Sequence, residues 1–306
     1  MKNNNTNLFQ EIIKLFRKCF PYIVRDDNTI RQILSHKDNQ FAEERNETGD
    51  LVGISVINEN VILLFCVEEA YRNRGIGDSL LKQSEALIQS NGYKNVKVGV
   101  GFDYFMPGVP TSKRYADAVN ECLDEHVNEE AGRFFEAHGY RHSQDGNIFD
   151  MRFPLKDFNK EKYSVGDTIN GITYRFATES DRESVYACTD DALKEFTKWY
   201  MYDALYSSKQ VPKVLIATEG EVVCGALLVE VANEEQKLGT IGCTSVRKAC
   251  QGKGIATNMV TLGTKYLRDI GMKDAYLSYT YTGLDKMYGY AGYKIFVYYM
   301  MAQKEL

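Results

Sequence analysis

The stretch Arg72-Asn73-Arg74-Gly75-Ile76-Gly77 has a counterpart 179 residues later, Gln251-Gly252-Lys253-Gly254-Ile255-Ala256. Each copy follows an apolar, strand-like segment and opens an amphipathic, helix-like segment. A glycine-rich turn at the start of a helix exposes backbone N–H groups at the positive end of the helix dipole, where a pyrophosphate can bind. The repeat therefore predicts two similar domains in tandem.

The segments around the two copies follow the same order. Around the first copy we expect helices and strands over 8–20, 27–36, 41–44, 51–57, 60–67, 78–90 and 96–100. Around the second we expect them over 172–176, 181–201, 213–218, 222–231, 240–246, 257–270 and 275–281. This order predicts an α/β fold with domains over 1–156 and 171–306, each a mixed, mostly antiparallel sheet flanked by helices.

The two halves differ in length after the glycine motif. The distance from Gly77 to Gly139 is 62 residues, whereas that from Ala256 to Gly292 is 36. The first half therefore carries about 26 extra residues, which we place near 102–127; long insertions in compact domains are often functional. An equally favoured alternative is that the insertion only packs between the domains.

Composition excludes several classes of function. The chain has 306 residues and a net charge of -5, with no long basic run, so nucleic acid is not an expected partner. The sequence contains no run of about 20 apolar residues, so it predicts no membrane span. The polar N-terminus does not have the pattern of a secretion signal. Seven cysteines without a Cys-x-x-Cys pair favour reduced thiols in the cytoplasm. The acidic balance suits a cationic substrate, or solubility alone.

The strand, glycine motif, helix, strand and aromatic closing phrase together resemble the GNAT superfamily of acetyl-coenzyme A-dependent acetyltransferases. The closing phrases are residues 134–140 and 287–293. The tandem layout is similar to that of mycothiol synthase-like and bacterial glucosamine/glucosaminide N-acetyltransferases. The resemblance implies acetyl-CoA as co-substrate and no metal.

The resemblance also implies where the co-substrate binds. In the family, the strand before the motif separates from its neighbour and pairs with pantetheine, and the pyrophosphate lies over the glycine turn. In the second domain these positions are Thr244, Ser245, Val246, Gln251, Gly252, Lys253, Gly254, Ile255 and Ala256. The first-domain counterparts are 65–67 and 72–77, so coenzyme A binding there stays open.

One closing-phrase position distinguishes the two domains. In the family, a tyrosine four residues before the closing glycine commonly gives a proton to the departing thiolate. The second domain has Tyr288 there, whereas the first has Phe135, which has no proton to give. We therefore expect the second domain to be catalytic and the first not. The competing interpretation of Tyr288 is aromatic packing.

The general base is less clearly marked. Many relatives use a glutamate on the strand before the motif, but residues 240–244 contain no acid. Two substitutes are Asp285, one helical turn before Tyr288, and Glu230 at the end of the preceding strand. Asp285 has a structural alternative, because 282–285 resembles a capping box. Deprotonation through water without a dedicated base is a third possibility.

Together these observations predict an N-acetyltransferase that acetylates the primary amine of a small molecule. An amino sugar such as glucosamine or a glucosaminide is one candidate acceptor. The alternatives are a peptide or protein amine acetyltransferase, and a non-catalytic acyl-CoA-binding regulatory protein. We expect a monomer or a homodimer.

Overall fold

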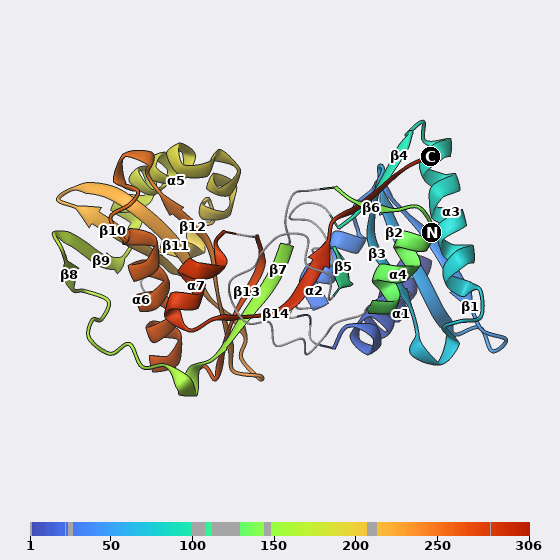
Figure 1. The fold of residues 1–306 in the computed structure, drawn as a ribbon, viewed down its shortest axis with the longest axis horizontal. Helices are drawn as coiled ribbons and strands as arrows, with labels where there is room; N and C mark the ends of the chain where they lie inside the picture. The colour runs from blue at the N-terminus through green and yellow to red at the C-terminus, as the bar shows by residue number, and fades with distance from the viewer. Residues whose placement is uncertain are drawn as a thin grey trace. The chain divides into compact units, whose positions relative to one another are not determined.

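The protein is described by a computed structural model that covers residues 2–21, 23, 27–99, 108–111, 129–143, 148–206, 213–281 and 283–306. Apart from 108–111, the insertion predicted near 102–127 lies outside these residues. The described chain forms two compact units (Figure 1), residues 2–149 with 297–306 and residues 150–296. None of the described helices combines the length and the apolar character needed to cross a membrane.

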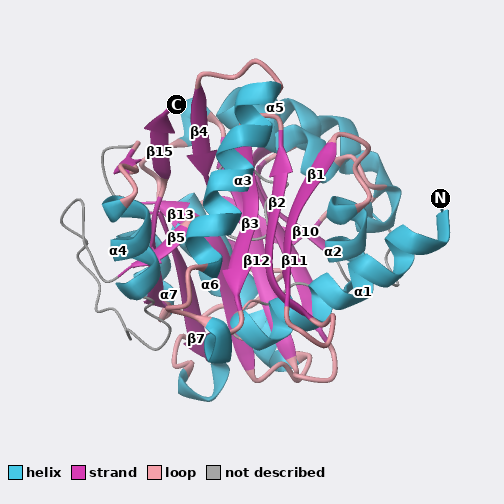
Figure 2. Cartoon of the chain, turned by 90° about the vertical axis from the view of Figure 1, so that its right-hand side faces the viewer, coloured by secondary structure: helices cyan, strands magenta, loops and turns pink. Residues whose placement is uncertain are grey.

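The first unit contains a mixed six-stranded sheet with the order β1-β2-β3-β4-β15-β6. Only the β3–β4 pair in it is recorded as parallel. Its helices are α1 (Lys2–Cys19), α2 (Asp27–Leu34), α3 (Ile76–Ser90) and α4 (Glu129–Ala137). The strands of this sheet are β1 (Asn39–Arg45), β2 (Leu51–Asn58), β3 (Val61–Val67), β4 (Asn95–Val98), β6 (Arg141–His142) and β15 (Ala302–Glu305). The short strand β5 (Val109–Thr111) lies in the same unit but pairs with residues 298–300 of β14 in the other sheet. Figure 2 shows α3 lying along β2 and β3.

The second unit contains most of a nine-stranded sheet with the order β5-β14-β7-β13-β12-β11-β10-β9-β8, in which β5 and residues 297–300 of β14 belong to the first unit. Its strands are β7 (Ile148–Pro154), β8 (Thr168–Ile169), β9 (Ile172–Phe176), β10 (Lys213–Glu219), β11 (Val222–Asn233), β12 (Leu238–Val246), β13 (Asp274–Tyr281) and β14 (Lys294–Met300). Its helices are α5 (Arg182–Thr197), α6 (Ile255–Asp269) and α7 (Asp285–Ala291). The two mixed sheets flanked by helices confirm the predicted fold class.

Each sheet includes a strand from the other half of the sequence. β15 lies between β4 and β6 of the first unit, with Ala302 opposite both Val98 and His142. β7, which precedes the linker, lies beside β13 in the second unit. The observed units therefore differ from the expected contiguous halves 1–156 and 171–306. The reason is that β7 and β15 pair with strands that lie far away in the sequence, which local sequence patterns do not indicate.

The core of the second unit is arranged around β11, whose residues from Val223 to Val229 are all buried. Continuous burial indicates that both faces of the strand are covered. Ala226 and Leu228 belong to a cluster with Val185 and Cys188 of α5. On the opposite face, Leu227 and Val229 approach Gly263 of α6 so closely that a Cβ there would lie 2.9 Å from Leu227. The sheet that carries the glycine motif is therefore held between two helices.

A second close approach generates a stability prediction. Gly292 has φ +120°, and an added Cβ would lie 2.5 Å from the buried ring of Phe153. Gly292→Ala should lower the free energy of unfolding by about 3 kcal/mol, since positive φ and overpacking add. Gly166→Ala is the matched control, because its φ is +109° with no atom within 4 Å. It should cost about 1 kcal/mol. Denaturant titration measures both, and equal losses would contradict the steric argument.

Buried tyrosines make the stability sensitive to alkaline pH. Burial holds the pKa of Tyr293 well above its ordinary value, and its hydroxyl lies 3.1 Å from the Thr264 hydroxyl. Above about pH 10 the unfolded chain therefore loses this proton while the folded protein keeps it, so stability falls as pH rises. When the pH rises from about 9 to 11, the free energy of unfolding of Tyr293→Phe should fall by about 1.4 kcal/mol less than that of the wild type.

The control for this prediction is Tyr290→Phe, at a position that is 58% exposed. Its free energy of unfolding should change with pH as that of the wild type does. Parallel pH dependence for Tyr293→Phe and the wild type would refute the assignment.

Candidate functional site

Both glycine motifs adopt the same local conformation. Gly254 and Gly75 have φ of 75° and 80°, and each is the N-cap of the helix that follows, α6 or α3. Two residues earlier, Gly252 and Asn73 also have positive φ, 79° and 58°. Left-handed residues at these positions turn successive N–H groups toward one side, which is how anion-binding turns are built. Each unit therefore carries a helix N-terminus suited to a pyrophosphate.

In the second unit, the strand before the motif separates from its parallel neighbour. β12 pairs with β13 only from Leu238 opposite Asp274 to Thr240 opposite Tyr276, although both strands continue well beyond that point. In the first unit, β3 pairs with β4 at Val61 and Ile62. Among the described residues, no further register pair joins either couple. The backbone that follows is available to a strand-like ligand, as the family resemblance implies for pantetheine.

A bulge in β12 lies just after this separation. The register with β11 shifts between Ala226 and Leu228, and Cys243 has φ 52°. Such a conformation costs on the order of 1–3 kcal/mol in a non-glycine residue and persists only where its surroundings hold it. The hydroxyls of Tyr200 and Ser245 both donate to the Cys243 carbonyl, at 2.7 and 3.0 Å. Ser245, a predicted cofactor residue, thus also fixes the bulge.

Tyr288 of α7 reaches the same strand. Its hydroxyl lies 3.1 Å from the Thr244 hydroxyl, and its side chain is buried. Burial raises the pKa of Tyr288 to about 12, against the opposing effect of the hydrogen bond to Thr244. The phenol is therefore protonated at neutral pH and can donate a proton. The structure brings together two residues that the sequence placed in one site, while the catalytic role of Tyr288 and the cofactor-binding role of Thr244 remain predictions.

Asp285, the other predicted catalytic residue, has a structural task. Its carboxylate is buried and accepts a hydrogen bond of 3.2 Å from the backbone N–H of Gly283. The bond holds the turn before α7, but the N-cap of that helix is Leu284, so Asp285 stands at the first helical position rather than at the N3 position of the suspected capping box. Thr282, the first residue of the suspected capping box, lies outside the described residues. Nothing in these contacts assigns Asp285 a proton-transfer role.

Glu230, the other candidate base, lies beside the separated strands. It is paired with Thr240 in the β11–β12 register, and burial raises the pKa of its carboxyl group. Its charge contributes to the raised pKa of the Cys243 thiol, so the two side chains are close. β11 continues to Asn233, so Glu230 is inside the strand rather than at its end as the sequence predicted. A carboxylate with a raised pKa is the better proton acceptor near neutral pH.

Sequence reasoning missed two residues that shape this region, Tyr200 and Asp150. Asp150 of β7 is fully buried and accepts hydrogen bonds from the Tyr276 hydroxyl, at 2.6 Å, and from the Tyr279 backbone N–H, at 2.9 Å. Tyr279 has φ 52°, so the aspartate holds a second irregular strand beside the first. Asp150 could not be placed here from sequence, because it comes from the other side of the linker.

The first unit has a cavity of about 210 Å³ at its own motif. Residues of β3, of the glycine turn and of α4 line it, among them Phe65, Cys66, Val67, Arg72 and Phe135. The three β3 residues are the counterparts of the pantetheine positions predicted in the second domain. The cavity therefore lies where a co-substrate would bind, but Phe135 offers it no proton.

Comparison with known proteins agrees with this geometry. Residues 174–291 match the profile of the acetyltransferase (GNAT) family. No curated protein sequence matches the chain. Among solved structures, the fold is similar to a glucosamine N-acetyltransferase region of a fungal multi-domain GH3 β-N-acetylglucosaminidase, with TM-score 0.72 and 19% identity. That match covers 98% of this chain and 37% of the fungal one, so the chain spans little more than a third of that protein.

Two other structures match over nearly their whole length. A GCN5-related N-acetyltransferase from Sphaerobacter thermophilus has TM-score 0.66 and 19% identity, covering 96% of this chain and 91% of that one. A tandem GNAT protein from the clavulanic acid biosynthesis pathway has TM-score 0.68 and 12% identity, covering 99% and 96%. At these identities the likeness establishes the fold. Residues 174–291 therefore form a domain that matches the acetyltransferase (GNAT) family, and the whole chain has a fold similar to that of tandem GNAT proteins.

Proposed function

We propose that the protein transfers an acetyl group from acetyl-CoA to the primary amine of a small molecule, with the chemistry in the second unit. The observation that carries the proposal is the contact between the Tyr288 and Thr244 hydroxyls on the separated strand that leads into the glycine turn. This contact supports the proposal, because burial keeps the Tyr288 phenol protonated at neutral pH and the family resemblance expects the thioester on this strand. Phe135 stands at the corresponding position of the first unit.

We assign the co-substrate to the separated strand and the glycine turn of the second unit. The backbone of Thr244, Ser245 and Val246 would pair with pantetheine, and the turn over 251–256 would hold the pyrophosphate. Lys253 of this turn is ion-paired with the exposed Glu219 at 3.0 Å. Exposed pairs of this kind contribute little to stability, so Lys253 can turn to a phosphate at low cost.

The co-substrate supplies an activated acetyl group and a thiolate leaving group. We assign Glu230 the role of accepting a proton from the amine, directly or through one water. The neutral nitrogen then attacks the thioester carbonyl as a nucleophile. Tyr288 gives its proton to the departing sulfur. The raised pKa values of the two side chains suit these opposite tasks, because burial keeps the phenol protonated and makes the carboxylate more basic.

An amino sugar is the acceptor class that we favour. The fungal structure with the similar fold is described as a glucosamine N-acetyltransferase region. In this chain, Tyr281 at the end of β13 is 45% exposed and close enough to Tyr288 to influence its pKa. An exposed aromatic ring beside the proton donor is a suitable platform for the apolar face of a sugar.

Coenzyme A release with a panel of amines tests this proposal. Glucosamine and a glucosaminide should give saturable release, whereas a short peptide with a free N-terminus should not. Preference for the peptide would favour a protein-amine acetyltransferase instead. Acetyl-CoA binding without release for any amine would favour the regulatory alternative, with the first-unit cavity as its obvious pocket.

Tyr288→Phe removes the proposed proton donor while keeping the ring. It should lower kcat by about a hundredfold, the usual contribution of a positioned acid, and leave acetyl-CoA binding within a few-fold of wild type. Steady-state turnover and calorimetric binding measure the two effects. Tyr290→Phe, an exposed position on the same helix, should retain full turnover. Unchanged kcat in Tyr288→Phe would remove the tyrosine from the mechanism.

Glu230→Gln tests the proposed base through pH dependence. A base works only when deprotonated, so kcat/KM of the wild type should fall as the pH drops through the raised pKa of Glu230. Glu230→Gln should lose about tenfold or more in activity at neutral pH and should lack this acidic limb. An acidic limb that persists in Glu230→Gln would assign the base elsewhere, with Asp285→Asn as the next variant.

A further inference from the structure

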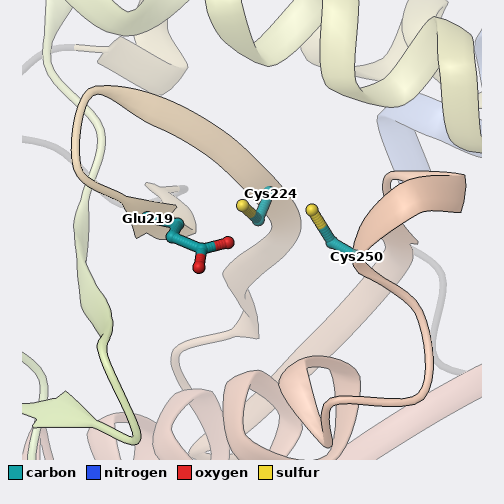
Figure 3. A group of neighbouring side chains, drawn as sticks. All are labelled: Glu219, Cys224 and Cys250. Atoms are coloured by element: carbon teal, nitrogen blue, oxygen red, sulfur yellow. The ribbon is translucent and has the colours of Figure 1, made fainter.

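Three potential metal ligands meet on the second unit, beside the glycine turn. They are Glu219 at the end of β10, Cys224 on β11 and Cys250 at the end of the short 3₁₀ helix Lys248–Cys250. Their carboxylate oxygen and sulfur atoms all lie within 4.8 Å of one another. Figure 3 shows the Cys224 side chain between the Glu219 carboxylate and the Cys250 sulfur. Both thiols are buried, whereas Glu219 is exposed.

The donor set selects a class of cation. Two sulfurs and one carboxylate suit Zn²⁺ and similar thiophilic divalent ions, whereas Mg²⁺ and Ca²⁺ prefer oxygen ligands alone. Tetrahedral Zn²⁺ with Zn–S bonds of about 2.3 Å separates its sulfur ligands by roughly 3.8 Å. Since all three ligand atoms lie within 4.8 Å of one another, the sulfur–sulfur distance exceeds this value by at most about 1 Å. Glu219 is exposed, which leaves room for water as a fourth ligand.

We propose that Glu219, Cys224 and Cys250 form a site for a thiophilic divalent cation such as Zn²⁺. The site lies directly before the glycine turn, since Cys250 immediately precedes Gln251. It requires none of the groups assigned to acetyl transfer, although Lys253 touches both regions.

The backbone holds the ligands in place. Glu219 is paired with Val222 in the hairpin that also carries Cys224. Arg247 connects the two cysteines, because its N–H donates to the Cys224 carbonyl at 2.9 Å and its carbonyl accepts from the Cys250 N–H at 2.8 Å. The Arg247 guanidinium adds a hydrogen bond of 2.7 Å to the Val223 carbonyl. A ligand set fixed in this way loses little conformational entropy when an ion binds.

In the metal-free protein, other groups satisfy the ligands. Lys253 neutralises Glu219 at 3.0 Å. The Cys224 thiol donates a long hydrogen bond of 3.7 Å to the Val222 carbonyl. A cation therefore binds by displacing thiol protons and by competing with Lys253 for the carboxylate. This competition links the metal to the glycine turn, because Lys253 belongs to both.

Co²⁺ titration of the chelator-treated, reduced full-length protein tests the site. One equivalent of Co²⁺ should produce a thiolate-to-cobalt charge-transfer band, and one equivalent of Zn²⁺ should abolish it. Cys224→Ser and Cys250→Ser should both lose the band. Cys243→Ser, a thiol of the same unit outside the cluster, should keep it.

Two exposed positions test the site without risk to the core. Glu219→Gln should weaken Co²⁺ binding by about tenfold or more, as loss of a ligand or of its support does. Lys253→Gln should tighten it several-fold, because the competing cation is removed. A band retained in both cysteine variants, or no band in the wild type with free thiols at both positions, would overturn the proposal.

Discussion

The site depends on the separation of β12 from β13 after Thr240 and Tyr276. Two parallel strands that stayed paired would satisfy each other's N–H and C=O groups and leave none for a ligand. Two irregular residues accompany the separation, Cys243 on one strand and Tyr279 on the other, both with positive φ. Hydroxyl donors hold the first, and the buried carboxylate of Asp150 holds the second. The core thereby stabilises a local conformation that the backbone alone would not adopt.

The many tyrosines of the second unit serve two tasks, which burial and hydrogen-bond partners distinguish. Tyr200 uses its hydroxyl to hold the Cys243 carbonyl, and Tyr293 places its hydroxyl against Thr264 in the core. Tyr288 is equally buried, but its partner Thr244 lies on the separated strand. Packing and chemistry are therefore compatible at Tyr288. The packing fixes the phenol, and its low-dielectric surroundings keep it protonated.

Local features of the fold could be predicted from the sequence, and non-local ones could not. The helices α3 and α6 and their glycine turns were expected because periodicity and glycine placement are local signals. The swapped strands β7 and β15 were not, since their partners lie on the far side of the linker. Asp150 could not be predicted for the same reason, because it lies on β7. The left-handed Cys243 could not be predicted because a bulge without glycine has no characteristic sequence. Cys224 and Cys250 are 26 positions apart and show no recognised metal spacing.

The two units differ at a pair of contacting positions, one in the closing phrase and one on the strand before the glycine motif. In the second unit, the Tyr288 hydroxyl faces the Thr244 hydroxyl. In the first, Phe135 stands at the tyrosine position and its ring lies 5.3 Å from that of Phe65, the first of the three β3 residues matched to 244–246. A buried hydroxyl without a partner is costly, and so is a polar strand residue facing an apolar ring. In the first unit, Phe135 in place of a tyrosine thus goes together with the apolar Phe65 on the strand. This pairing favours a catalytic second unit and a first unit that binds coenzyme A or supports the fold.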